Sequence, residues 1–367
     1  MAIVNVLIMA GGTGGHVFPA LAVAARLREL GHAVTWMGAP DSFESRKVPE
    51  AGFPIEYVRV SGLRGKGVMK LITAPLLLLR ALLDALAVLQ KTQPAVVLGM
   101  GGFAAGPGGL AACLKRVPLV IHEQNAAAGL TNRLLARLAT VVLQAFPNTF
   151  PHGAQTVGNP TRMGFAELPT PAARVAATGL ARVLVVGGSQ GAKALNQIVP
   201  QALALLPATT RPRVRHQAGR TLAVAQAAYA EVGLADASEA FITDMPAAYA
   251  EADLVICRSG ASTIAEVAAA GVASVLVPFP FAVDDHQTAN ARYLAEAGAA
   301  VLIQERDLTP QRLAQTLQGL LADRAALVRM GEAARGKAWT QATEDIVAAL
   351  LAVSRPPSPI PAVEVQK

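Results

Sequence analysis

The feature that most constrains the fold of this chain is a glycine-rich turn that follows a short apolar run and occurs twice. Residues 6–16 read VLIMAGGTGGH, and residues 183–193 read VLVVGGSQGAK. The apolar residues of each copy predict a buried strand, and the glycines remove side chains where that strand turns into the next helix. Two such turns in a chain of 367 residues predict two domains that each open with the same strand and turn.

Apolar runs alternate with helical patterns on both sides of a proline-rich stretch at 147–181, which is typical of a linker. This alternation predicts an α/β fold with a doubly wound parallel sheet in each half. The expected strands are 3–9, 33–38, 55–60, 95–99, 118–121 and 140–144, then 182–187, 213–217, 239–242, 253–257, 273–277 and 300–303. The expected helices include 17–30, 67–90, 106–115 and 128–138, and 309–335 and 338–353 close the chain.

The composition limits the cellular compartment and the kinds of partner that are expected for this chain. A net charge of +7 favours an anionic partner, such as a phosphate-bearing ligand or an acidic membrane surface. Nucleic acid is the weakest candidate, because aromatic residues make up only 4% and no basic run is interleaved with stacking residues. Two distant cysteines fit a reducing, cytosolic setting and exclude a thiolate metal cage. The first apolar run reads as a strand rather than a signal peptide.

The first turn predicts a phosphate contact, because bare backbone amides at a strand end and helix start suit a diphosphate. A plain tight turn needs fewer glycines than this one has. A dinucleotide site is the main competitor, but Val17 stands where that motif has its third glycine, and the second strand ends at Gly38 without a carboxylate for the ribose. These two departures argue against a nicotinamide-dependent oxidoreductase.

Further polar clusters follow other predicted strands. GMGGFAAGPGG at 99–109 is a second glycine-lined strand end, and HEQN at 122–125 follows the strand PLVI. Asn125 is the favoured ligand contact in HEQN, with a buried and satisfied His122–Glu123 pair as the alternative. In the second half, CRSGASTIAEVAAAG at 257–271 opens a helix with small residues, so its first amides face an anion and Glu266 can accept hydrogen bonds from ribose hydroxyls. The alternative for Glu266 is a first-turn acid that stabilises the helix dipole.

Two other segments admit more than one reading. DDHQ at 284–287 combines two acids with a histidine, but no further ligand completes a metal site, so Gln287 is read as a sugar contact. The segment 63–91 is apolar on nearly all sides and is interrupted by Pro75, Arg80 and Asp84, which excludes a clean membrane span. It is either a buried helix or a surface patch that rests on lipid.

Seven motifs in this order resemble the MurG family of bacterial N-acetylglucosaminyltransferases: GGTGGH, GMGGFAAGPGG, HEQN, GNPTR, GGSQGA, CRSGAST-AE and DDHQTANA. The resemblance covers residues 6 to about 345. It implies a GT-B fold with two Rossmann-like domains that face a cleft. Residues 1–160 plus a helix at about 338–354 would bind the lipid acceptor, and residues 161–337 the UDP-sugar.

The resemblance implies inverting transfer of N-acetylglucosamine from UDP-N-acetylglucosamine to the C4 hydroxyl of undecaprenyl-diphospho-muramoylpentapeptide, which converts lipid I to lipid II, without a cofactor or metal. Such an enzyme serves peptidoglycan synthesis, cell shape and division from the cytoplasmic face of the inner membrane. The substrate-binding residues that it implies are Thr13, Gly14, Gly15, Asn125, Arg162, Ser189, Ile242, Ala261, Ser262, Thr263, Ile264, Ala265, Glu266 and Gln287. His286 matches the family pattern less securely than Gln287 does.

His16 is the candidate general base, because a histidine ordinarily titrates near pH 6.5 and can take a proton from the attacking hydroxyl. A carboxylate in that role is the alternative. The membrane patch of the family would fall in 66–90, with Lys115, Arg116, Arg133 and Arg137 as further basic candidates. A diacylglycerol glycosyltransferase and a non-catalytic protein that binds nucleotide sugars or lipid carriers are the remaining alternatives.

Overall fold

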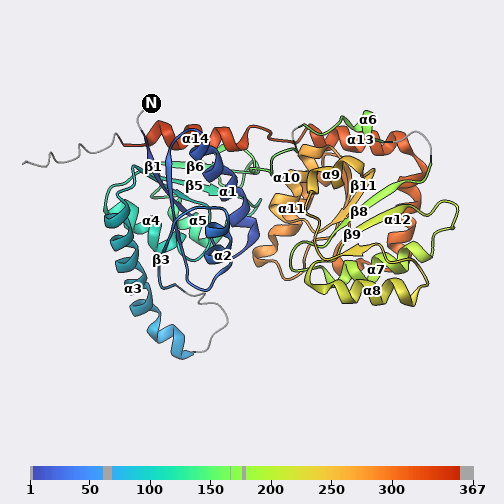
Figure 1. The fold of residues 1–367 in the computed structure, drawn as a ribbon, viewed down its shortest axis with the longest axis horizontal. Helices are drawn as coiled ribbons and strands as arrows, with labels where there is room; N and C mark the ends of the chain where they lie inside the picture. The colour runs from blue at the N-terminus through green and yellow to red at the C-terminus, as the bar shows by residue number, and fades with distance from the viewer. Residues whose placement is uncertain (1–2, 61–67, 166, 176–178, 356–367) are drawn as a thin grey trace, which may run out of the picture. The chain divides into compact units, whose positions relative to one another are not determined.

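The structure, a computed structural model, describes residues 3–60, 68–165, 167–175 and 179–355, with only the backbone of residues 68–74. The chain forms two compact units, which Figure 1 shows as two separate sheets flanked by helices. The first unit comprises Met1–Gln124, Ala128–Val157 and Gln341–Lys367, and the second comprises Asn125–Ala127 and Gly158–Thr340.

A seven-stranded parallel sheet forms the centre of the first unit, in the order β3-β2-β1-β4-β5-β6-β7. Its strands are β1 (Asn5–Met9), β2 (Ala33–Gly38), β3 (Ile55–Tyr57), β4 (Val96–Gly99), β5 (Leu119–Glu123), β6 (Val141–Gln144) and β7 (Ala154–Thr156). Its helices are α1 (Gly14–Glu29), α2 (Phe43–Glu50), α3 (Val68–Thr92), α4 (Ala105–Leu114), α5 (Leu130–Leu135) and α14 (Ala342–Val353).

The alternation of side chains along β1 explains why helices cover both faces of this sheet. Val6 and Ile8 enter one apolar core with residues of α1 and α14, whereas Leu7 and Met9 enter another with residues of α3 and α4. All four side chains are fully buried. A strand that is apolar on both faces is stable only inside a parallel sheet with two helical layers, as the unbroken run VLIM predicted.

The second unit repeats this plan with a six-stranded parallel sheet in the order β10-β9-β8-β11-β12-β13. Its strands are β8 (Arg182–Val186), β9 (Arg213–Gln217), β10 (Ser238–Glu239), β11 (Leu254–Cys257), β12 (Ala273–Leu276) and β13 (Ala300–Leu302). Its α-helices are α6 (Pro171–Arg174), α7 (Lys193–Ala204), α8 (Leu222–Glu231), α9 (Met245–Glu251), α10 (Ala261–Ala270), α11 (His286–Ala295), α12 (Pro310–Ala322) and α13 (Arg324–Arg335). Short 3₁₀ helices are η1 (Gly219–Thr221), η2 (Val283–Asp285) and η3 (Glu305–Asp307).

The two units are therefore built around corresponding strands. β1 lies between β2 and β4, and β8 lies between β9 and β11. The glycine turns that follow β1 and β8 accordingly emerge at the carboxyl edge of each sheet, next to the loops of both neighbouring strands.

Several expected elements differ in the structure. The stretch 147–181 contains the edge strand β7, which pairs with β6 and was not expected from the local sequence pattern. The helices α2 and α6 were not expected either. The expected strand 239–242 is only Ser238–Glu239. The single helix expected at 309–335 is wrong, because it breaks at Asp323, whose carboxylate accepts a hydrogen bond from the Ala326 amide at 2.9 Å and begins α13.

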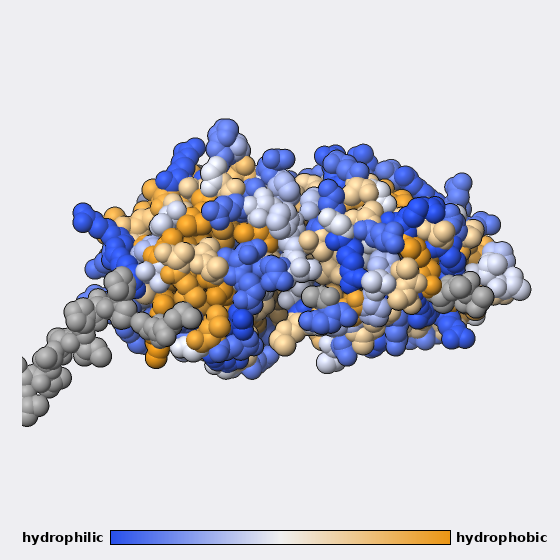
Figure 2. Space-filling view, turned by 90° about the horizontal axis from the view of Figure 1, so that it is seen from above, coloured by the Kyte–Doolittle hydropathy of each residue, from blue (hydrophilic) through white to orange (hydrophobic). Residues whose placement is uncertain are grey.

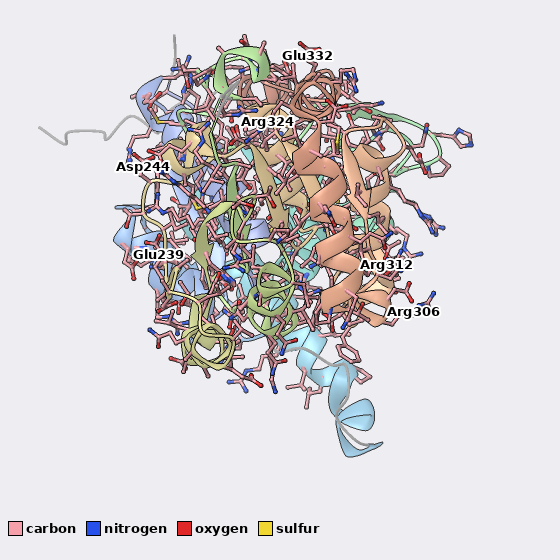
Figure 3. All side chains as sticks on the ribbon, turned by 90° about the vertical axis from the view of Figure 1, so that its right-hand side faces the viewer. Glu239, Asp244, Arg306, Arg312, Arg324 and Glu332 are labelled. Atoms are coloured by element: carbon pink, nitrogen blue, oxygen red, sulfur yellow. The ribbon has the colours of Figure 1, made fainter. Side chains whose placement is uncertain are left out.

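Buried and exposed ion pairs contrast in the second unit. The fully buried carboxylate of Asp253 accepts hydrogen bonds from the Arg182 guanidinium at 2.8 Å and from Arg324 at 3.4 Å, which joins the starts of β8, β11 and α13. By contrast, Arg306 and Arg312 project from the region where α12 begins (Figure 3). They approach Asp307 only at 3.9 and 3.8 Å, so these exposed pairs contribute little to stability.

A buried histidine makes the second unit sensitive to acid. His216 on β9 is fully buried, with Nε2 3.0 Å from Asn196 Oδ1 and Nδ1 3.3 Å from the Tyr229 hydroxyl. Asn196 directs its amide nitrogen to the Ala218 carbonyl, so its oxygen faces His216 and accepts the Nε2 proton. Burial lowers the pKa of His216 to about 4, because the protonated ring would lie in an apolar core.

We expect this histidine to give the second unit a stability that is lost at low pH. Its folded pKa lies below the ordinary value, so its contribution is complete above pH 6.5 and declines as pH falls toward 4. The loss should reach about 3 kcal/mol, which a His216→Gln variant should largely lack. Amide hydrogen exchange of β8 and β9 between pH 7 and pH 4 measures it. Equal pH dependence in both proteins would contradict the prediction.

Candidate functional site

In both units, the glycine turn packs directly against the backbone of a neighbouring loop. The Gly11 amide donates to the Gly101 carbonyl at 3.2 Å. Gly102 has φ 93°, and a Cβ there would lie 2.7 Å from the backbone of Gly11. In the second unit, a Cβ on Gly219 would collide with the backbone of Gly188 and Gly191. Some of the glycines therefore serve contact between loops rather than contact with a ligand.

A buried carboxylate occupies part of the first turn. Glu44 on α2 is 2% exposed and accepts hydrogen bonds from the Gly12 amide at 2.9 Å and the Ala39 amide at 3.1 Å. As the sequence analysis noted, β2 ends at Gly38 without an acid for a ribose, and the acid that follows further along the chain, Glu44, binds the turn itself. In the first turn of α1 the His16 amide donates to the Thr13 carbonyl at 3.2 Å, so the amides left for a ligand are those of Gly14 and Gly15, and the N-cap Thr13 makes no side-chain capping hydrogen bond.

His16 lies in that first turn and contacts the end of β5. Its Nδ1 is 2.9 Å from Oε1 of Gln124, a side chain that is 1% exposed. The backbone of Gly101 lies against the imidazole ring, because a Cβ there would be 2.8 Å from Nδ1. Neither Gln124 nor the ring contact of Gly101 was foreseen, although both residues stand in motifs that the sequence analysis singled out.

The four residues of HEQN have different surroundings. His122 and Glu123 are buried, and Glu123 Oε2 accepts hydrogen bonds from Asn132 at 2.9 Å and from the Gly129 amide at 3.2 Å. Glu123 therefore holds the start of α5, which agrees with the structural alternative for that residue. Asn125 belongs to the second unit, where its Oδ1 accepts a hydrogen bond from Asn290 at 3.2 Å.

Asn290 on α11 is a residue that the sequence analysis missed. It is fully buried, and its Oδ1 accepts the Ala126 amide at 2.7 Å while its Nδ2 donates to the Ser259 carbonyl at 3.1 Å. It therefore ties the segment Asn125–Ala127 to the loop that precedes α10. Its position within the motif DDHQTANA is the sequence signal that could have identified Asn290.

The start of α10 is the strongest candidate for an anion site in the second unit. Its N-cap is Gly260, which has no side chain to satisfy the first amides, and the helix runs from Ala261 to Ala270. At the other end, the buried guanidinium of Arg174 donates to the carbonyls of Ala270 and Gly271. A cation at the carboxyl end complements the helix dipole there and leaves the amino end to attract an anion. Burial lowers the pKa of Arg174 to about 10.

Glu266 lies beyond the first turn of α10, so the alternative of a dipole-stabilising acid is wrong. Its side chain is almost completely buried, and Oε1 lies 3.2 Å from Nε of Arg162. Burial raises the pKa of Glu266, and the positive charge of Arg162 lowers it by a smaller amount. A carboxylate kept in such a place suits a ligand that donates hydrogen bonds to it.

The other expected contacts of the second unit also follow its strands. Ser189 is exposed in the turn after β8. Ile242 is fully buried, and its amide donates to Gln217 Oε1 at 3.2 Å. Gln287 begins α11 together with His286, and its Oε1 accepts the Phe279 amide at 2.9 Å. Ser189, Ile242, Glu266 and Gln287 thus gather toward the carboxyl edge of one sheet.

The acids of DDHQ have a structural role. Asp284 and Asp285 both adopt positive φ, and Asp285 accepts a hydrogen bond from the Thr288 hydroxyl at 2.7 Å rather than from a helix amide. Across the described part of the chain, no three His, Cys, Asp or Glu side chains are grouped so that they could hold a metal ion.

Comparison with known proteins adds to this geometry. Residues 6–144 match the glycosyltransferase family 28 N-terminal domain, and residues 182–348 match the glycosyltransferase family 28 C-terminal domain. The calicheamicin glycosyltransferase CalG4 shares the fold with a TM-score of 0.65 at 19% identity, over 97% of this chain and all of that one. The fold and the site thus define a two-domain GT-B glycosyltransferase of family 28.

Closer relatives narrow the class further. UDP-N-acetylglucosamine--N-acetylmuramyl-(pentapeptide) pyrophosphoryl-undecaprenol N-acetylglucosamine transferases of Alkalilimnicola ehrlichii and Nitrosococcus oceani are 58% and 55% identical, over 90% of this chain and 94% of each relative. The crystal structure of Acinetobacter baumannii MurG superposes with a TM-score of 0.84 at 44% identity, over 95% of this chain and 99% of that one. The chain belongs to this family, the MurG family of N-acetylglucosaminyltransferases.

Proposed function

We propose that this enzyme transfers N-acetylglucosamine from UDP-N-acetylglucosamine to the C4 hydroxyl of the lipid-linked muramoyl-pentapeptide, with inversion at the anomeric carbon. The observation that carries the proposal is the amino end of α10, whose first amides have no capping side chain, in the same helix as the buried carboxylate of Glu266. The family membership names the sugar and the acceptor.

The second unit is proposed to bind the donor. The amides of Ala261, Ser262 and Thr263 would hold the diphosphate, with Ile264 and Ala265 completing the first turns of the helix. Ser262 supports this assignment, because its hydroxyl oxygen is buried and has no partner among the described residues. Arg162 is 40% exposed at its side chain, so it can meet the phosphate charge while it also pairs with Glu266.

The remaining proposed donor contacts are assigned from the positions of their residues in the second unit. Glu266 would accept hydrogen bonds from the ribose hydroxyls, and the carbonyl of Ile242 would accept one from the base. Ser189, Asn125 and Gln287 offer neutral polar groups for the diphosphate and the sugar. Helix amides and a guanidinium can stabilise the charge that develops on the leaving diphosphate.

The first unit is proposed to bind the acceptor and to supply the base. The acceptor hydroxyl attacks the anomeric carbon, the bond from that carbon to the diphosphate breaks, and the electron pair departs with UDP. The hydroxyl proton passes to His16, whose first-turn position beside Thr13, Gly14 and Gly15 adjoins the free amides of α1. The neighbouring acid Glu44 is already engaged with two backbone amides, which favours His16 over that carboxylate.

A transfer assay with radiolabelled UDP-N-acetylglucosamine and a soluble lipid I analogue tests the reaction and its base. We expect His16→Ala to lower kcat by about 100-fold or more while its donor affinity stays within about twofold, because only proton transfer is lost. His152→Ala, at an exposed histidine, is the matched control. A loss below tenfold in folded protein would remove His16 as the base. Transfer to diacylglycerol, or binding without transfer, would support the two alternative functions instead.

Donor binding tests Glu266 separately from catalysis. Glu266→Ala removes two hydrogen bonds to a charged acceptor and should weaken UDP-N-acetylglucosamine binding by roughly 2–4 kcal/mol, measured by isothermal titration calorimetry. Glu266→Gln should lose less, because it keeps one acceptor oxygen. Glu251→Ala, at an exposed acid of the same unit, should bind normally. Unchanged affinity in Glu266→Ala would exclude Glu266 from the donor site.

An exposed leucine surface on the first unit is the proposed membrane contact. It comprises Leu76, Leu78, Leu79 and Leu83 of α3, Leu110 and Leu114 of α4, and Leu134 and Leu138 at α5. These helices are neighbours, since α3 packs on α4 and α4 packs on α5. Figure 2, which views the molecule from above, shows further apolar residues at the surface of the first unit. Leucines in such numbers at a surface mark an interaction site.

Exposed cations accompany this leucine surface. Lys115 and Arg116 follow α4, and Arg133 and Arg137 lie in and just after α5. They suit the anionic lipids of a bacterial inner membrane, which is consistent with a peripheral enzyme on its cytoplasmic face. Lys66 lies outside the described residues, as does the side chain of Lys70. In the part of the chain that the structure describes, no helix has the length and apolar character needed to cross a bilayer.

Vesicle flotation tests this surface. We expect Leu79→Glu combined with Leu83→Glu to lower binding to phosphatidylglycerol vesicles by at least about tenfold, because two charges would enter the lipid interface. Turnover of the soluble acceptor analogue should be unchanged. Leu205→Glu, at an exposed leucine of the second unit, is the control. Equal vesicle binding by all three proteins would overturn the proposed membrane contact.

A further inference from the structure

The hydrogen bonds around Gln124 determine which way its amide points. Nε2 of Gln124 lies 3.2 Å from the backbone carbonyl of His122 and 3.2 Å from Nδ1 of the same residue. A carbonyl oxygen only accepts hydrogen bonds, so the group that faces it must be the NH2 of the amide. The opposite orientation would bring two oxygens together in a site where Gln124 is 1% exposed.

This orientation leaves the oxygen of Gln124 facing His16. Oε1 is 2.9 Å from Nδ1 of His16, and an amide oxygen cannot donate a hydrogen bond. Nδ1 of His16 must therefore carry the proton. In a neutral imidazole the other nitrogen, Nε2, then has the free electron pair.

We infer that Gln124 is a positioning residue that holds neutral His16 as the Nδ1–H tautomer and so makes Nε2 the proton acceptor. The inference deepens the proposed function and rests on the role of His16 as base. Gln124 would act as the orienting partner does in a catalytic triad, but without a negative charge. Gly101 restricts the same ring, because its backbone lies against Nδ1 and Cε1.

A neutral orienting group has a chemical consequence. A carboxylate next to the imidazole would favour the protonated ring, which cannot accept a proton, whereas an amide oxygen fixes the tautomer with less effect on the charge. His16 and His122 are titratable side chains that contact Gln124. A buried glutamine at this position therefore fixes the orientation of His16 without placing a negative charge beside the ring.

Imidazole ¹⁵N NMR of histidine-labelled protein tests the tautomer directly and needs no turnover. His16 is assigned by the loss of its signals in His16→Ala. At about pH 8.5 the wild type should show Nδ1 protonated and Nε2 with the shift of an unprotonated nitrogen. In Gln124→Met, which keeps the shape but removes the acceptor, the signals should move toward the other tautomer. An unchanged pattern in Gln124→Met, or Nε2–H in the wild type, would overturn the inference.

Kinetics separate positioning from packing. Gln124→Met should lower kcat by about 10–100-fold with the donor KM within about twofold, as expected when a group that orients a catalytic histidine is lost. Gln124→Glu restores the acceptor for Nδ1, so the folded variant should recover the Nδ1–H signal. Its second oxygen faces the His122 carbonyl, so its folding is checked first by circular dichroism. It should also move the acidic limb of the kcat–pH profile to higher pH, because a carboxylate stabilises the protonated ring. Loss of turnover in both variants with no change in tautomer or profile would overturn the inference.

Gln144 provides a matched control for both measurements. It ends β6 beside Glu123 of β5, is 5% exposed, and makes two hydrogen bonds, from the Phe150 amide and to the Thr156 hydroxyl, both at 2.9 Å. Gln144→Met removes the same groups from a similar environment without touching His16. Its tautomer and kcat should match the wild type, and a shift of the His16 signals in this variant would count against a specific role for Gln124.

The outcomes also distinguish this inference from the proposed function. If His16→Ala keeps more than a tenth of wild-type turnover, the proposed base fails, whatever tautomer His16 adopts. If His16→Ala loses turnover but wild-type His16 carries its proton on Nε2, the base stands and the role of Gln124 fails.

Discussion

The amides at the start of each helix that follows a parallel strand have no acceptor within their own helix, and the rest of this molecule depends on where they find one. A parallel sheet places all these helix starts at one edge, and their N–H groups must find partners. In the second unit, Gly260 supplies no capping side chain, and Arg174 complements the carboxyl end of the same helix. The protein thus satisfies the carboxyl end of α10, and the proposed function assigns the amino end to the diphosphate of the donor.

In the first unit the protein itself takes part of the corresponding amides. The Gly101 carbonyl and the Glu44 carboxylate take the amides of Gly11 and Gly12, so the turn is held in place before any substrate arrives. The amides that follow remain open, and they adjoin His16. Backbone dipoles that are fixed in this way have little to reorganise as charge develops near them.

The sequence allowed the two parallel sheets to be predicted, because an unbroken apolar run followed by glycines has few structural solutions, and it placed the candidate site residues after the strands of those sheets. VLIM and VLVV lie in interior strands of their sheets. The partners that orient the site could not be predicted in the same way. Glu44, Gln124 and Asn290 act through contacts between residues far apart in sequence, and β7 depends on pairing with β6 rather than on its own pattern. Asp323 had a local capping signal that the helical period concealed.

The path of the chain through the two units has a consequence for biosynthesis. α14 contributes Ile346 and Leu350 to the core beside β1, yet it is translated after the whole of the second unit. The first unit therefore stays incomplete on the ribosome, with the part of one apolar core that α14 covers left exposed, while the second can close. Gly158 and Trp339, near the two ends of the second unit, lie in contact, so that unit emerges as an insertion with neighbouring termini. Nascent chains that stop before α14 would expose that face and be prone to aggregation or to binding by chaperones.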